Sequence, residues 1–259
     1  MVPPRTLLGP GPFRVEQLPE RSSYELSNGH AILCAPTGRR GGRSNLIGGE
    51  VLDTDPAVKS AGVDVGFSPS PGDMRAPDIS VGDFSNEPGW APGAPPLAVE
   101  YADTGQDEDE LQLKVGELLA AGTKFLWVVR LVGPRRVEIH EPGKQMRLAH
   151  PGDELVAPGI LHNPVRVEAL FDRDAAHEAT LRNLLQRRGY ESLDEVRRVG
   201  VAEGVMEGYQ DALLAIMSAR ALELTDEQRR LVLASTDPNE LTGWIARAAT
   251  AESTSEIFG

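Results

Sequence analysis

Two carboxylates in the middle of the chain could do chemistry together. Asp78 follows a proline in "RAPDISVG", and Glu100 lies inside the apolar run "LAVEYA". Carboxylates that converge on one point form a hard-oxygen site for Mg²⁺ or Mn²⁺. Such an ion polarises a phosphate group and activates a water molecule. We therefore expect Asp78 and Glu100 to be metal ligands if the fold brings their two strands together.

A lysine belongs in such a site, because an ammonium group stabilises the charge that builds up on a phosphate during hydrolysis. The strand after Glu100 offers none, since it continues with Tyr101 and Ala102. The next cation is Lys114, which lies beside the apolar stripe of a predicted helix at 106–122. An unpaired buried charge is costly. The spacing therefore predicts that Lys114 turns toward the two carboxylates and acts as the lysine of the site.

Each of these residues also has an ordinary structural interpretation. Asp78 could be a turn residue, and Glu100 could form a salt bridge with an arginine such as Arg75. Lys114 could lie at the surface with its stem on apolar neighbours. Glu25, in "YELSNGH", could point to solvent from a hairpin or belong to the site. In the plainest alternative, the acids and the lysine form only a structural ion-pair cluster.

The elements that must position these residues are visible in the sequence. Asn28-Gly29 predicts a tight hairpin turn. Acidic residues crowd the start of the helix at 106–122, and Gly122 suits its C-terminal cap. The segment "GRRGGR" at 38–43 is expected to be a loop, either a basic loop beside the site or an ordinary flexible one. Residues 1–22, rich in proline and glycine, are expected to be a mostly extended arm.

The order of the predicted elements gives the fold class. Strands, a helix and further strands follow each other, which indicates an α/β domain with a mixed central sheet and flanking helices. From residue 172 the sequence becomes helical, with start signals at Ser192, Thr225 and Asp237. We expect an α/β domain over 1–171 and a helical extension over 172–259.

Composition limits the classes of function. The net charge is −13, and neither half of the chain is basic, which argues against nucleic-acid binding by broad phosphate neutralisation. The negative net charge does not exclude a local basic strip around an acidic metal site. Cys34 is the only cysteine, which excludes a disulfide framework and a thiolate metal cluster. The apolar runs are too short for a membrane span, so we expect a cytoplasmic protein without membrane partners.

Several pieces together resemble the PD-(D/E)XK nuclease superfamily and, within it, the Uma-type family of restriction endonucleases. They are "YELSNGH", "APDISV", "LAVEYA" and "ELQLKVGELLAAGTKFLWVV". The last is the most specific, because a lysine seven residues before Ala-Gly and an aromatic-Trp-aliphatic strand are typical of that family. The resemblance covers roughly residues 13–171. The chain departs from the family pattern after Glu100, at Glu110 and at Arg130.

The resemblance implies a restriction-endonuclease-like fold and phosphodiester hydrolysis in nucleic acid, with DNA as the expected substrate. It implies Asp78 and Glu100 as ligands of Mg²⁺ or Mn²⁺, Lys114 as the catalytic lysine and Glu25 as a further catalytic acid. The alternative is a nuclease fold without activity, which serves as a binding or assembly module through its helical tail. The chain is also a candidate homo-oligomer.

Overall fold

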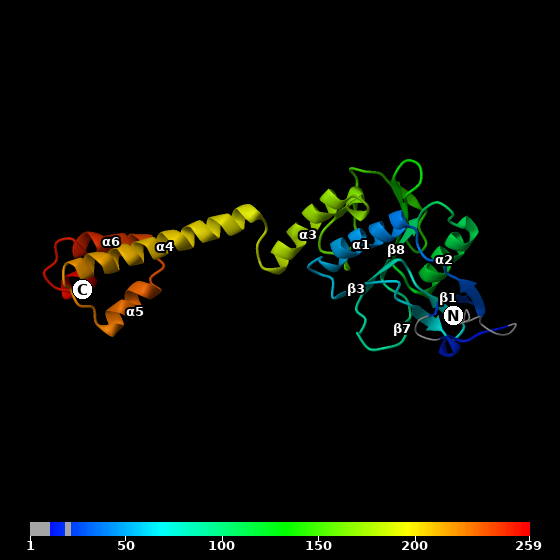
Figure 1. The fold of residues 1–259 in the computed structure, drawn as a ribbon, viewed down its shortest axis with the longest axis horizontal. Helices are drawn as coiled ribbons and strands as arrows, with labels where there is room; N and C mark the ends of the chain where they lie inside the picture. Colours follow the sequence, from blue (N-terminus) through cyan, green and yellow to red (C-terminus); the bar gives the residue numbers. More distant parts are fainter. Residues whose placement is uncertain (1–10, 19–21) are drawn as a thin grey trace, which may run out of the picture. The chain divides into compact units, whose positions relative to one another are not determined.

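The computed structural model describes residues 11–18 and 22–259, and it divides into a unit over 1–189 and a unit over 190–259 (Figure 1). Three sheets, one of them the β12-β13 pair, and three α-helices build the described part of the first unit. Its strands are β1 Tyr24–Ser27, β2 His30–Leu33, β3 Ser60–Val63, β4 Phe67–Ser70, β5 Asp73–Arg75, β6 Ile79–Gly82, β7 Ala91–Pro92, β8 Leu97–Ala102, β9 Phe125–Arg130, β10 Arg136–His140, β11 Arg147–Ala149, β12 Glu154–Leu155 and β13 Val165–Arg166. Its helices are α1 Arg39–Asp53, α2 Glu108–Ala121 and α3 Arg173–Arg187, with short 3₁₀ helices at Val15–Gln17 (η1) and Val167–Leu170 (η2).

The larger sheet has the strand order β11-β10-β9-β8-β6-β3. It is mixed, because β8 and β9 run parallel while their other neighbours run antiparallel. The second sheet has the order β2-β1-β5-β4-β7. The predicted α/β architecture with a mixed central sheet is confirmed. The hairpin turn at Asn28-Gly29 is also confirmed, and both residues have positive φ.

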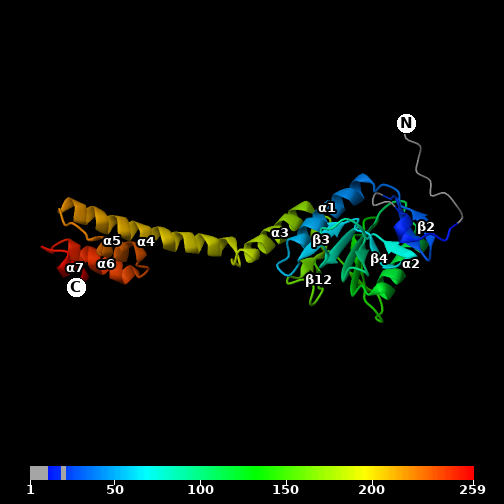
Figure 2. The ribbon, with the colours of Figure 1, turned by 90° about the horizontal axis from the view of Figure 1, so that it is seen from below.

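The two faces of β8 carry two different cores, as side-chain alternation requires. Val99 and Tyr101 pack with α1 in one cluster, whereas Ala98 and Ala102 pack with α2 in another. The two helices accordingly cover opposite faces of the sheet (Figure 2). Glu100 shares its face with Ala98 and Ala102, so it faces α2.

Helix α1 differs from the prediction. Its first residue is Arg39, so residues 39–43 are helical and the loop prediction for the segment at 38–43 is wrong. Glycines weaken an isolated helix by about 1 kcal/mol each relative to alanine, but here one of them is required. A Cβ atom at Gly48 would collide with the hydroxyl group of Tyr101. That hydroxyl donates a hydrogen bond of 2.8 Å to the Leu170 carbonyl, so Gly48 lets α1 pack close to β8.

The first unit extends beyond the predicted boundary at Phe171. Asn183 and Arg187 of α3 donate hydrogen bonds to backbone carbonyls at the end of α1 and in the residues after it, including Val51 and Asp55. These contacts explain why α3 belongs to the α/β unit, which ends at Gly189. Most of the predicted extended arm, residues 1–10 and 19–21, lies outside the described residues; η1 interrupts the rest.

The second unit is helical. It contains α4 Leu193–Ala219, α5 Asp226–Ala234, α6 Pro238–Ala248 and α7 Ser255–Phe258. The three predicted helix starts are confirmed, since the side chains of Ser192, Thr225 and Asp237 each accept a backbone hydrogen bond in the first turn of α4, α5 and α6. In the part of the chain that the structure describes, no helix is both long and apolar enough to cross a membrane.

Candidate active site

Asp78, the residue directly before β6, lies opposite Glu100 of β8. Ile79 of β6 pairs with Val99 of β8, so the next step of the antiparallel register brings Asp78 to Glu100. The backbone N–H of Tyr101 donates to Asp78 Oδ2 at 2.6 Å. The fold therefore fixes the Asp78 carboxylate beside the strand that carries Glu100.

Lys114 reaches this point from α2. Its Nζ lies 2.8 Å from Glu100 Oε1 and 3.1 Å from Glu25 Oε1, and it donates to the Ala76 carbonyl at 2.8 Å. Glu25 comes from β1 and is only 5% exposed, so the solvent-facing interpretation of Glu25 is wrong. The structure thus gathers all four residues expected at the site, from two strands, the residue before a third strand and one helix.

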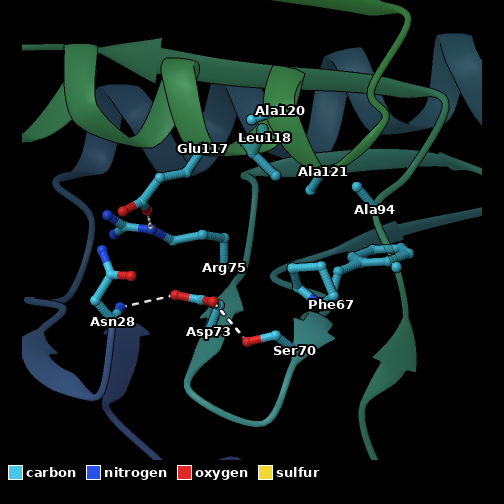
Figure 3. A pocket seen from close by; sticks show the side chains of 12 residues that line it. Asn28, Phe67, Ser70, Asp73, Arg75, Ala94, Glu117, Leu118, Ala120 and Ala121 are labelled. Atoms are coloured by element: carbon cyan, nitrogen blue, oxygen red, sulfur yellow. Dashed lines mark hydrogen bonds and ion pairs between the residues drawn. The ribbon is translucent and has the colours of Figure 1, made fainter.

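Arg75 holds the acidic side of this cluster together. Its guanidinium lies 2.9 Å from Glu25, 2.6 Å from Glu110 and 2.5 Å from Glu117, measured between the closest nitrogen and oxygen atoms. The alternative in which Arg75 neutralises Glu100 is therefore wrong. Arg75 and Glu117 also line a separate pocket of about 260 Å³ (Figure 3). Arg75 is therefore a structural neighbour of the site. The sequence alone suggested Glu100 as its partner, whereas its partners in the structure are other glutamates.

Two further residues at the site had no sequence signal. Asn45 of α1 donates from Nδ2 to Asp78 Oδ1 at 3.1 Å. Asp64 follows β3 with φ of 54°, a left-handed conformation that aspartate adopts more readily than most residues. Asp64 lines the same cleft of about 430 Å³ as Asp78, Glu100 and Lys114. The cleft therefore contains more carboxylates than the pattern of motifs suggested.

Comparison with known proteins gives the family and the fold of the chain. Residues 13–165 match the model of the Uma2 family, described as "putative restriction endonuclease". The chain belongs to the Uma2 family. It is also similar to the crystal structure of a protein titled as a putative nuclease of the DUF820 family, from Anabaena variabilis, with 16% identity and a TM-score of 0.52. That match covers 62% of this chain and 98% of the other, and at this identity it shows the shared fold. A search of curated proteins found no match.

In this Uma2-family site, the carboxylates of Glu25, Asp64, Asp78 and Glu100 outnumber the single ammonium group of Lys114. Burial, reinforced by Asp78, raises the pKa of Glu100 to about 8. Burial also raises the pKa of Asp64, and Asp78 adds to that shift. Burial alone would lower the pKa of Lys114, but Glu100 and Glu25 outweigh it and raise that pKa. Burial thus favours the uncharged forms of Glu100 and Asp64, and a cation bound beside them would offset the cost of their negative charge.

A divalent cation fits this imbalance. Asp78 and Glu100 offer only oxygen donors, the ligands that Mg²⁺ and Mn²⁺ prefer. Among residues 11–18 and 22–259, no group of three or more His, Cys, Asp or Glu side chains is arranged to hold a metal ion. Mg²⁺ commonly uses one or two carboxylates and completes its shell with water and substrate phosphate. The two residues are thus suitable as candidate ligands.

The raised pKa of Glu100 predicts a pH dependence of stability in the metal-free protein. The folded state binds this proton with a pKa of about 8, against 4.5 for the free group. The stability from protonated Glu100 is therefore complete below about pH 4.5 and is lost as the pH rises through about 8. Urea unfolding in EDTA between pH 4.5 and 8.5 should show this fall, and Glu100→Gln should flatten it. The control Glu154→Gln, at an exposed position, should leave the pH dependence of the unfolding free energy unchanged. The same pH dependence in Glu100→Gln as in wild type would contradict the raised pKa of Glu100.

Proposed function

We propose that the chain is a Mg²⁺- or Mn²⁺-dependent endonuclease that hydrolyses phosphodiester bonds of DNA. The observation that carries the proposal is the contact of Lys114 Nζ with Glu100 and Glu25 in a cleft that Asp78 also lines. A lysine held at buried carboxylates, in a member of a family described as "putative restriction endonuclease", suits reaction at a phosphate. Net charge alone would not have suggested this substrate.

The side chains have distinct roles in this proposal. Asp78 and Glu100 would hold the metal ion, and when bound the ion would supply Lewis-acid chemistry at the scissile phosphate and the attacking water. Asn45 and the backbone N–H of Tyr101 fix the orientation of the Asp78 carboxylate through their hydrogen bonds. Lys114 places its ammonium where negative charge develops on the phosphate oxygens.

Glu25 acts on the lysine rather than on the substrate. Burial would raise the pKa of Glu25, but Lys114 and Arg75 outweigh it and hold that pKa below its usual value. A charged Glu25 keeps Lys114 protonated and holds it at the cleft. In the reaction, a bond forms from the water oxygen to phosphorus, the bond to the leaving oxygen breaks, and the water proton passes to the leaving group or to solvent.

A cleavage assay with the full chain tests the proposal. Labelled duplex DNA, single-stranded DNA and RNA are incubated with the protein in millimolar Mg²⁺ or Mn²⁺, and in EDTA. We expect metal-dependent cleavage of DNA, its loss in EDTA, and its loss in Asp78→Asn, which keeps the shape of the side chain but removes its charge. Cleavage that persists in EDTA, or in a folded Asp78→Asn variant, would contradict the proposed mechanism. Cleavage of RNA alone would contradict the choice of substrate.

A further inference from the structure

A hollow of about 440 Å³ on the first unit is lined mainly by arginine. Its lining residues are Arg39, Arg40, Arg43, Ser44, Arg135 and Phe171. The arginines come from two segments far apart in the sequence, the first two turns of α1 and the turn between β9 and β10. None of the lining residues is acidic, in a chain whose net charge is −13. The hollow is therefore a local basic surface that the average composition does not explain.

Most of these arginines lack a carboxylate partner. Of the four arginines of the hollow, only Arg40 forms an ion pair within the described residues, and its partner is Asp103. Arg39 and Arg43 are exposed on α1. Arg135 donates to the Leu131 carbonyl at 2.8 Å, and its guanidinium carbon lies 5.3 Å from the centre of the Phe171 ring. These contacts orient Arg135 but leave its charge uncompensated, unlike that of Arg75 or Arg130, which each contact two or more carboxylates.

The hollow adjoins the candidate active site. Asp103, the partner of Arg40, also lines the acidic cleft, and so does Gly38, the residue before α1. The first turn of α1 contains no acidic residue, and Gly38 provides no side-chain cap. The positive end of the helix dipole therefore adds to the charge of Arg39 and its neighbours. A chain of phosphates that reaches the cleft would meet this surface next.

We propose that the hollow binds the phosphate backbone of the nucleic acid whose scissile bond lies in the cleft, with Arg39, Arg43 and Arg135 as the contacts. This inference rests on the proposed function, and it adds the path that the nucleic-acid backbone follows on the protein surface. Arginine suits the role, because its planar guanidinium donates two parallel hydrogen bonds to a phosphate and remains charged. The surface contacts backbone rather than base edges, so it contributes affinity without sequence preference.

Binding measured without cleavage tests the inference. The full chain is titrated against a fluorescent 20-base-pair DNA duplex in EDTA, over a range of KCl concentrations. Each phosphate contact contributes about −0.9 to the slope of log K against log salt for duplex DNA. Arg39→Ala/Arg43→Ala should weaken binding and make the slope shallower by about two. Arg39→Lys/Arg43→Lys keeps both charges and should retain most of the slope.

A matched control separates local contacts from the change in net charge. Lys124→Ala/Arg188→Ala removes two exposed cations of the same unit that line neither the hollow nor the cleft. We expect it to leave the slope within half a unit of wild type. Equal slopes for wild type and Arg39→Ala/Arg43→Ala, with DNA bound, would overturn the inference and leave the proposed nuclease function standing. If the wild type cleaves no DNA with metal and binds none in EDTA, both proposals fail.

Discussion

Lys114→Ala should lower the rate of DNA cleavage by about 10² to 10³-fold, the effect of removing one preorganised group that stabilises transition-state charge. The reason is geometric, because Lys114 is the only side chain that brings an ammonium group to the buried carboxylates of the described cleft. The loss should appear in kcat more than in KM, since the ammonium acts where charge develops rather than on substrate binding in general.

The same variant should keep its response to divalent cations, since Asp78 and Glu100 remain. Single-turnover cleavage and metal-dependent unfolding are measured side by side on one preparation, which also shows that the variant is folded. Lys124→Ala, an exposed lysine just after α2, is the control and should cleave at the wild-type rate. Full activity of Lys114→Ala would remove the lysine from the mechanism.

Arg75→Ala should lower the free energy of unfolding by about 3–5 kcal/mol, the usual cost of breaking a buried ion pair by removing one partner. The side chain of Arg75 is 4% exposed and contacts three carboxylates, of which Glu25 is itself buried. Without the guanidinium, Glu25 keeps only Lys114 as a charged partner. The change should therefore appear as lost stability and as a misplaced Lys114.

Urea unfolding at pH 7 measures the effect. Arg75→Lys keeps one charge but cannot span three carboxylates with a planar fork, so we expect an intermediate loss. Arg40→Ala, which breaks an ion pair at the surface, should change the free energy of unfolding far less, because solvent screens exposed ion pairs. A loss for Arg75→Ala as small as that for Arg40→Ala would contradict the central place of Arg75 in the cluster.

Local patterns in the sequence were sufficient for much of the site. Alternation in "LAVEYA" placed Glu100 on one face, and the apolar stripe of α2 placed Lys114 toward the same face. Both are short-range periodic signals. These signals alone placed Glu100 and Lys114 on the same side of the sheet. In the structure, the register between β6 and β8 brings Asp78 to Glu100.

Other features depend on contacts between distant segments and have no local signal. Arg75 meets Glu117 only because β5 and α2 pack together, and Asn45 meets Asp78 across the edge of the sheet. The left-handed conformation of Asp64 is likewise set by tertiary structure. The start of α1 was missed because closely spaced glycines normally indicate a loop. Close packing against Tyr101 explains the glycine at position 48.

The most direct test of the central claim, a divalent-metal site at Asp78 and Glu100, is the unfolding free energy of wild type and Asp78→Ala with and without Mg²⁺ or Mn²⁺. An ion that binds only the folded state stabilises it by about 2.7 kcal/mol at a hundred times its dissociation constant. We predict stabilisation that grows with metal concentration in wild type and is absent in Asp78→Ala. Equal stabilisation of both proteins, or none in either, would contradict the claim and leave Asp78, Glu100 and Lys114 as a structural ion-pair cluster.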